Sequence, residues 1–234
     1  MTSVGPHSDD AVALVTGGAR GLGIEVCRQL TQAGMTVWLT ARDMAHAEAV
    51  ASEMAGDGAV RAARLDVADP ESVAALATRL ERLDVLVNNA AIDYDTDATA
   101  LNADLDRVRR ALETNLFGAW RVAQAFAPLL RASPHGRLVN VSSEGGAITE
   151  MGGGLPAYHT SKLALNGLTR MLAAELRRDG VLVNSVCPGW TATDMGEGGG
   201  RPVAEGARSV VWACLLDDDG PSDGFFRDGR SLPW

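Results

Sequence analysis

The chain has 234 residues, enough for one domain with a sizeable core, and its apolar content of 46% is ordinary for a globular protein. A net charge of −9 and a pI near 4.9 argue against nucleic acid and anionic membranes as partners. No stretch approaches the roughly 18 apolar residues of a membrane-spanning helix, and the N-terminus lacks the pattern of a signal peptide.

The cysteines point to a reducing compartment. Cys27, Cys187 and Cys214 are odd in number and far apart, so they predict neither a disulfide framework nor a metal site. Thiols that pack as small apolar groups fit a reducing environment. We therefore expect a cytoplasmic protein without a metal.

Apolar runs and amphipathic segments alternate along the chain. Residues 1–10 predict a disordered tail, and residues 11–234 a single domain. Strands are expected within residues 11–17, 35–42, 59–67, 84–91, 136–143 and 180–189, with an edge strand in 224–234. Helices are expected over residues 22–33, 44–55, 69–83, 102–131 with a break near Glu113, 157–178 and 203–216.

The strands are apolar on both faces, which indicates a parallel sheet covered by helices on both sides. Right-handed crossovers then predict a single Rossmann-like, doubly wound α/β domain. Two glycine-rich stretches, 151–154 and 196–200, follow strand ends. They are either plain surface loops or mobile flaps beside a site.

The stretch TGGARGLG links the first strand to the first helix. Gly17, Gly21 and Gly23 allow the backbone to turn tightly and to approach a pyrophosphate at the helix N-terminus, where Leu22 also lies. The spacing G-x-x-x-G-x-G differs from the usual dinucleotide fingerprint, but the physical requirement is the same. This turn predicts a dinucleotide cofactor.

The end of the second strand discriminates between cofactors. An acidic residue there would hold a ribose hydroxyl, but the chain has Arg42, and Asp43 follows one step later. Arg42 and Arg20 can both meet a 2′-phosphate, which favours NADP(H) over NAD, although two ordinary surface arginines are the alternative. Asp66 and Val67 follow the third strand, where adenine is expected; a helix-capping region is the alternative, and both can hold.

Tyr158 and Lys162 lie one helical turn apart, and Lys162 is the sole lysine of the chain. An ammonium beside a phenol favours the phenolate and brings the tyrosine pKa toward 7, where general acid–base catalysis is most effective. A chance pair on a helix surface is the alternative. The pattern predicts a catalytic tyrosine with a lysine partner.

Six motifs in order resemble the short-chain dehydrogenases/reductases, from about Ala11 to the C-terminus. They are TGGARGLG, NNA at 88–90, Asn115, VNVSS ending at Ser143, Tyr158-x-x-x-Lys162 and CPGW at 187–190. Within that family, CPGWTATDMG and DGFFRDGRSLPW are most similar to the NADPH-dependent carbonyl reductases.

The resemblance implies a role for each matching residue. Ser143 orients and polarises a substrate carbonyl oxygen, Ser142 is structural, and Asn115 holds a water that connects Lys162 to solvent. Lys162 and Tyr158 also contact the nicotinamide ribose. The remaining cofactor contacts implied are Asn89, Ala90, Pro188, Gly189, Trp190, Thr191 and Thr193.

The chain departs from the family pattern in two places. Ala91 stands where the family has glycine, and the segment from Ser143 to Tyr158 is slightly longer than usual. Candidate pocket walls, for each of which plain packing or solvation is the alternative, are Tyr94, Glu144, Met151, Trp190 and Met195. His135 and His159 receive no role.

Three functions are compatible with these patterns. The first is an NADPH-dependent carbonyl reductase acting on a small-molecule carbonyl or alcohol. The second is a pathway enzyme of the same fold that acts on an imine, an enone or a cyclising intermediate. The third is an NADP(H) sensor without catalysis. The resemblance also implies a homo-oligomer, a dimer or tetramer, built through the helices around 114–131 and 157–178.

Overall fold

The structure, a computed structural model, describes residues 11–54, 59–193, 195 and 198–234. The predicted tail at 1–10 lies outside the described residues, as do parts of the expected second helix and of the second glycine-rich stretch.

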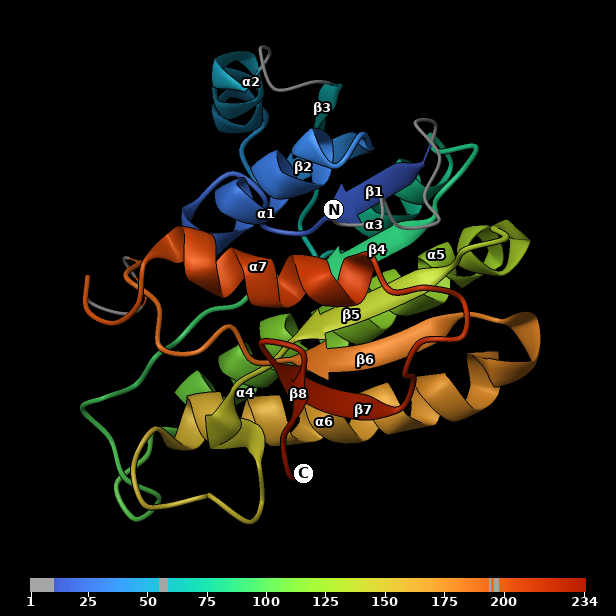
Figure 1. Cartoon of the computed structure of the whole chain (residues 1–234). Coiled ribbons are helices and arrows are strands. Elements are labelled where there is room, and N and C mark those ends of the chain that lie inside the picture. The colour runs from blue at the N-terminus through green and yellow to red at the C-terminus, as the bar shows by residue number, and fades with distance from the viewer. Residues whose placement is uncertain (1–10, 55–58, 194, 196–197) are drawn as a thin grey trace.

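Strands and helices alternate in the predicted order (Figure 1). The strands are β1 (Val12–Val15), β2 (Thr36–Ala41), β3 (Val60–Arg64), β4 (Val85–Asn88), β5 (Arg137–Val141), β6 (Leu182–Val186), β7 (Gly224–Arg227) and β8 (Arg230–Ser231). The α-helices are α1 (Gly21–Gln32), α2 (Met44–Glu53), α3 (Pro70–Ala77), α4 (Leu105–Leu112), α5 (Ala119–Ala132), α6 (Pro156–Leu176) and α7 (Val203–Cys214).

Within the described residues, eight strands form one sheet in the order β3-β2-β1-β4-β5-β6-β7-β8. Every neighbouring pair is parallel except β7 and β8, which form an antiparallel hairpin. Strands β2 and β3 lie on one side of β1, and β4 to β8 lie on its other side. This reversal of strand order at β1 makes the fold doubly wound. The predicted Rossmann-like α/β fold is confirmed.

Two hydrophobic cores cover the two faces of the sheet. One contains side chains of α1, α2 and α7, and the other contains side chains of α3, α5 and α6. Figure 1 shows α1 and α7 on one side of the strands and α5 and α6 on the other. The strands are buried on both faces because helices cover both, as their continuous apolar runs indicated.

The region expected to hold two helices with a break near Glu113 is instead continuously helical. α4 runs into a π-helix, η1 (Glu113–Gly118), which runs into α5 without an interruption of helical dihedral angles. The predicted break near Glu113 corresponds to this π-helix. The wider turns of a π-helix change the hydrogen-bond register while the chain remains helical. α3 ends at Ala77, earlier than expected, although Leu80 and Leu83 beyond it are buried.

No helix in the described part of the chain is both long enough and apolar enough to cross a membrane.

A buried arginine connects the start of β5 to the segment after α7. The Arg137 side chain is fully buried and donates to the backbone oxygens of Leu216 and Gly136, and to the carboxylate of Asp218. These carbonyls would be left without a donor if the guanidinium were removed, because no water can reach a fully buried site easily.

We expect Arg137→Met to lower the free energy of unfolding by roughly 2–4 kcal/mol, because buried acceptors lose their partner. Urea titration measures this change. Arg131→Met, which breaks an exposed pair with Asp179, is the control and should cost under about 1 kcal/mol. If both substitutions lowered the free energy of unfolding equally, the stabilising role assigned to the buried Arg137 side chain would be contradicted.

Candidate active site

The turns that follow β1, β4, β5 and β6 gather at the carboxyl edge of the sheet. Parallel strands all end at this edge, so residues far apart in sequence meet there. This edge brings together the predicted glycine turn, the segment after Asn88, Ser143 and the segment that begins at Cys187.

The glycine turn has a backbone that other residues adopt poorly. Gly17 and Gly21 have φ of +62° and +49°. A Cβ on Gly23 would lie 2.3 Å from the Gly17 carbonyl oxygen, so the first turn of α1 packs against the loop with no room for a side chain. Leu22 packs against the adjacent core. The turn therefore has the close packing and exposed helix N-terminus that a pyrophosphate requires.

Asn89 braces this turn from the end of β4. Its Nδ2 donates to the backbone oxygens of Thr16 (2.9 Å) and Gly17 (3.1 Å), and the Ala90 N–H donates to Thr16 Oγ1 (2.9 Å). A Cβ on Gly17 would lie 3.1 Å from Ala90 Cα. The NNA motif thus holds the glycine loop in place.

The two arginines predicted to meet a phosphate are both exposed. Arg20 stands at the N-cap of α1 and donates to the Ala91 carbonyl at 3.2 Å, while Arg42 follows β2 directly. Beyond β3, Asp66 Oδ1 accepts from the Ala68 N–H at 3.0 Å in a local turn, and the N-cap of α3 is Asp69 instead. The neighbouring Val67 is buried, and its carbonyl accepts from Arg121.

Ser143, Tyr158 and Lys162 lie together between β5 and α6. The hydroxyls of Ser143 and Tyr158 share a hydrogen bond. Lys162 Nζ lies 5.6 Å from the centroid of the Tyr158 ring and donates to the Val141 carbonyl at 2.7 Å. The Ser142 hydroxyl donates to the Lys162 carbonyl at 3.5 Å, which ties the strand to the helix.

Burial dominates the titration of both groups. It raises the pKa of the Tyr158 phenol, and the hydrogen bond with Ser143 opposes that rise. Burial also lowers the pKa of Lys162 to about 8. The sequence predicted a tyrosine pKa moved toward 7, the opposite direction. The physical reason is that desolvation outweighs the lysine charge, which is directed at the Val141 carbonyl.

Asn115 lies buried in the π-helix, a helix type that is frequent at functional sites. Its Oδ1 accepts from the Ile92 N–H (2.8 Å), and its Nδ2 donates to the Ile92 carbonyl (3.0 Å) and to Ser161 Oγ (2.9 Å). Asn115 thereby links the segment after β4 to the helix that carries Tyr158 and Lys162.

A buried carboxylate fixes the N-terminus of α6. Asp95 accepts from the backbone N–H groups of Ala157 (2.8 Å) and Tyr158 (3.1 Å). Tyr94 beside it makes an edge-to-face contact with the Tyr158 ring, with centroids 5.1 Å apart. Arg107 on α4 pairs with Asp93 and Asp97, on either side of these residues. The loop after β4 is thus attached firmly to the catalytic helix.

The segment after β6 reaches back to the glycine turn. Gly189 has φ of +73°, and Thr191 Oγ1 donates to the Gly189 carbonyl at 2.9 Å. A Cβ on Gly21 would lie 3.4 Å from the Thr193 side chain. The structure therefore brings Thr193, at the end of this segment, alongside the phosphate-binding turn.

Comparison with known proteins identifies the family. The family model described as short chain dehydrogenase matches residues 11–201. The chain belongs to the short-chain dehydrogenase family.

Similar proteins include reductases of this family. The chain is 34% identical to (+)-neomenthol dehydrogenase of Arabidopsis thaliana, over 92% of this chain and 95% of the relative. It is 33% identical to carbonyl reductase [NADPH] 3 of Mus musculus, over 95% and 98%. The solved structure of NADPH-bound carbonyl reductase from chicken fatty liver superposes with a TM-score of 0.85 at 27% identity, over 95% and 98%.

The predicted pocket walls of this short-chain dehydrogenase lie on three loops. Tyr94 contacts the catalytic tyrosine, whereas Glu144 is ion-paired with Arg227. Trp190 is 64% exposed, and Met151 and Met195 are partly exposed. Of the glycine-rich stretches, Gly152 and Gly153 border open space, and Gly199 packs against Trp190.

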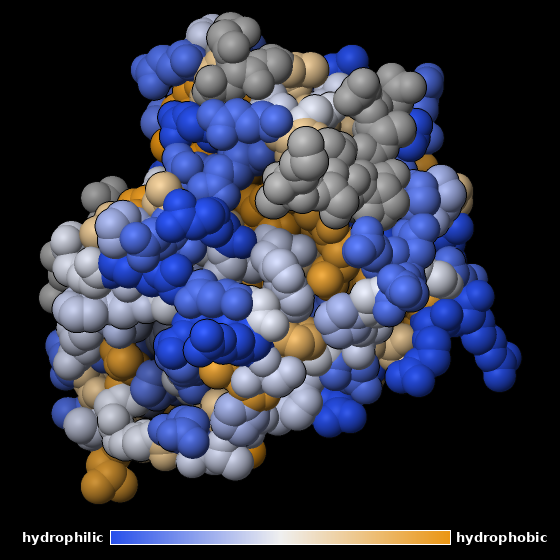
Figure 2. All heavy atoms as spheres, in the orientation of Figure 1, coloured by the Kyte–Doolittle hydropathy of each residue, from blue (hydrophilic) through white to orange (hydrophobic). Residues whose placement is uncertain are grey.

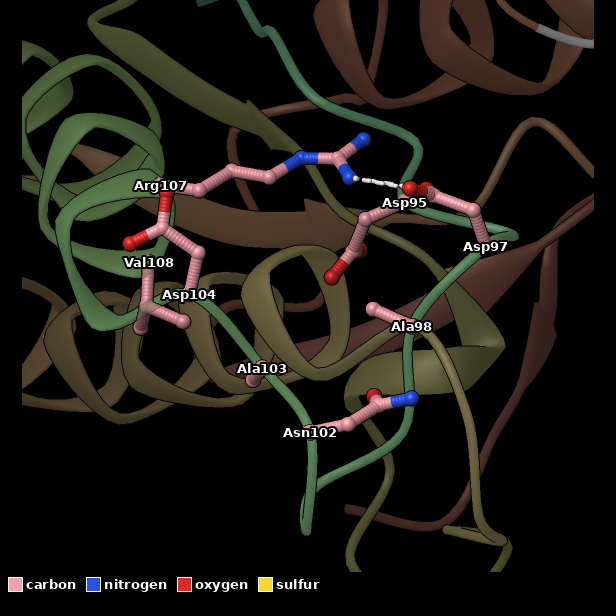
Figure 3. A pocket seen from close by; sticks show the side chains of 8 residues that line it. All are labelled: Asp95, Asp97, Ala98, Asn102, Ala103, Asp104, Arg107 and Val108. Carbon is pink, nitrogen blue, oxygen red and sulfur yellow. Dashed lines mark hydrogen bonds and ion pairs between the residues drawn. The ribbon is translucent and has the colours of Figure 1, made fainter.

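A small cavity of about 130 Å³ lies beside the loop that carries Tyr94 (Figure 3). It is lined by Asp95, Asp97, Ala98, Asn102, Ala103, Asp104, Arg107 and Val108. Figure 3 shows the Arg107 side chain extending across it toward Asp97. Loop and α4 residues form this cavity, and neither Ser143, Tyr158 nor Lys162 lines it. No group of three metal-ligating side chains occurs among the residues described.

Sequence reasoning missed Asp95, Ser161 and Arg227. Asp95 is distant in sequence from the helix it caps, so no local capping pattern could reveal it. Ser161 lies inside the Tyr158–Lys162 motif and offers only a hydroxyl. Nothing in the sequence distinguishes Arg227 from the other arginines, because its contact with Glu144 depends on the fold.

Burial of Lys162 costs stability while the side chain is charged. We expect Lys162→Met to be more stable relative to the wild type at pH 7 than at pH 10. Below pH 8 the lysine is charged in both the folded and the unfolded state, and the cost is complete. As pH rises from about 8 toward 10.5, the folded lysine loses its proton first and the cost disappears.

Urea unfolding of both proteins from pH 7 to pH 10 measures this difference. It should narrow by roughly 3 kcal/mol across that range. A difference independent of pH would show that the lysine is not desolvated.

Proposed function

We propose that this chain is an NADP(H)-dependent oxidoreductase that reduces a carbonyl carbon of a small molecule, or oxidises the corresponding alcohol. The observation that carries the proposal is the hydrogen-bonded Ser143–Tyr158 pair with Lys162 one turn away, at the sheet edge that also holds the glycine turn. The carbonyl reductases among the similar proteins support this choice.

Each residue then has a definite task. Ser143 donates a hydrogen bond to the substrate oxygen, where negative charge develops. Tyr158 is protonated at neutral pH because burial raises its pKa, so it can give its proton to that oxygen in the reductive direction. Lys162, still mostly charged at pH 7, stabilises negative charge on the phenol and offers a donor to ribose hydroxyls.

The residues present fit a bound dinucleotide. Gly17, Gly21 and Gly23 leave the space that its phosphates need, and the α1 N-terminus supplies backbone donors. When bound, NADPH supplies the hydride. Arg20 and Arg42 would hold the 2′-phosphate, Asp66 and Val67 would flank the adenine, and Pro188 to Thr193 would flank the nicotinamide.

Two other proposals concern assembly and location. A homo-oligomer would use the helices around 114–131 and 157–178, where Phe117 and Met171 are 45% and 51% exposed. A reducing, cytoplasmic location is supported by Cys27, Cys187 and Cys214, which are buried and free.

Purified protein should consume NADPH, followed at 340 nm, with at least one member of a panel of ketones, aldehydes, quinones, imines and enones. We expect Tyr158→Phe to lower kcat by at least about 100-fold, since the proton donor is lost. Thr160→Ala, on the exposed side of the same helix, is the control.

Different outcomes separate the alternatives. Turnover confined to imines or enones favours the pathway-enzyme function, and tight NADPH binding without turnover favours the sensor. Full activity of Tyr158→Phe would contradict the proposed mechanism.

We expect Arg42→Ala and Arg20→Ala each to raise the Kd for NADPH about tenfold while leaving the Kd for NADH within twofold, because only NADPH carries the 2′-phosphate. Quenching of protein fluorescence measures both constants. Arg131→Ala, in the last turn of α5, is the matched control. Equal weakening of both cofactors would refute the phosphate assignment.

A further inference from the structure

The β7–β8 turn consists of Asp228 and Gly229, with φ of +52° and +73°, the dihedral angles of a tight hairpin. The Asp228 N–H donates to Ser209 Oγ at 2.9 Å, and Ser209 Oγ donates to the Cys187 carbonyl at 3.1 Å. The Cys187 N–H in turn donates to the Phe226 carbonyl at 2.8 Å. The turn is therefore seated on α7 and on the end of β6.

Arg227, just before this turn, holds the loop that carries Ser143. Its Nη1 lies 2.5 Å from Glu144 Oε2, and Glu144 directly follows Ser143. The Glu144 N–H also bonds the Cys187 thiol. Two contacts thus fix the residue next to the hydroxyl that bonds Tyr158.

Asp228 holds the loop on the other side. Its carboxylate receives two bonds from Arg201, of 2.9 Å and 3.0 Å. The Arg201 backbone donates to the Trp190 carbonyl (2.8 Å) and accepts from the Ala192 N–H (3.0 Å), so Arg201 closes the base of the loop after β6. That loop contains Thr193, which lies against the phosphate-binding turn.

From these contacts we propose that the β7–β8 turn positions two parts of the active site separately. Arg227 positions the Ser143 loop, and Asp228, through Arg201, positions the Thr191–Thr193 segment. Opposite charges on neighbouring residues direct each to its own partner. The proposal rests on the oxidoreductase function proposed above and names positioning residues for that same site.

These ion pairs are suited to positioning rather than to stability. The side chains of Arg227 and Glu144 are 39% and 42% exposed, and that of Asp228 is 46% exposed. Figure 2 shows hydrophilic residues gathered over this face, so solvent screens both pairs. Such pairs contribute little to the free energy of unfolding, about 1 kcal/mol or less. Their loss should change catalysis without a comparable change in Tm.

The experiment uses the full chain with Arg227→Gln and Asp228→Asn. We expect Arg227→Gln to lower kcat about tenfold with the Kd for NADPH within twofold, because only the carbonyl-orienting loop is released. We expect Asp228→Asn to raise the Kd for NADPH about fivefold with kcat at saturating NADPH within threefold. Arg230→Gln in β8 and Asp219→Asn after α7 are the matched controls and should resemble the wild type in both constants.

Two further variants distinguish positioning from general loosening. Glu144→Gln should match Arg227→Gln, and the double variant should be no worse than either alone, since one interaction is lost in all three. Arg227→Lys, which keeps the charge, should restore part of kcat.

Three outcomes would overturn the proposal: a lower kcat together with a higher Kd for NADPH in both variants, no change in either constant, or losses of function that parallel a drop in Tm. A wild type that binds no NADPH overturns the oxidoreductase function itself, and the positioning role falls with it. A wild type that turns over normally beside unchanged variants overturns the positioning role alone.

Discussion

A hydrogen bond from Lys162 Nζ to the carbonyl of Val141 joins α6 to the end of β5. A cation this deeply buried has to be held by fixed dipoles, because water no longer solvates it. The carbonyl that receives it belongs to the last residue of β5, two positions before Ser143. The distance between the serine and the tyrosine is therefore set by the same contact that makes the lysine tolerable inside the protein.

Other contacts also fix the position of α6 relative to β5. Asp95 anchors its first turn, and Asn115 reaches Ser161 from a π-helix. Asp95 lies in the loop after β4, and Asn115 lies in the π-helix that continues α4. The helix is held at its start, at its catalytic turn and along its core face, which leaves it little freedom to shift relative to β5.

Much of this arrangement could be predicted from the sequence because it depends on local regularities. Continuous apolar runs predicted strands buried on both faces, and short motifs at strand ends indicated which edge of the sheet holds the candidate site. The loop after β6 brings Thr193 beside the phosphate-binding turn because parallel strands all end at the same edge of the sheet. The family, the fold and the order of elements are all confirmed.

The features that the sequence did not predict depend on contacts between residues distant in sequence, or on solvation. Asp95 caps a helix some sixty positions away, and Glu144 gained its partner only when β7 came beside β6. The direction of the Tyr158 pKa depends on how much water the folded loops exclude, which no motif encodes. The alignment with the neomenthol dehydrogenase spans 282 positions, more than this chain's 234 residues, so the relative has segments with no counterpart here.

The chain contains a single lysine, and that residue is 3% exposed. Reagents that acylate amines therefore find no lysine on the described surface, although arginine is abundant there. Acylation of Lys162 would occur only when the site opens, so its rate, measured on the peptide that contains Lys162, would report local opening of α6. Amine coupling of the folded protein to a support would accordingly use the α-amino group rather than a lysine.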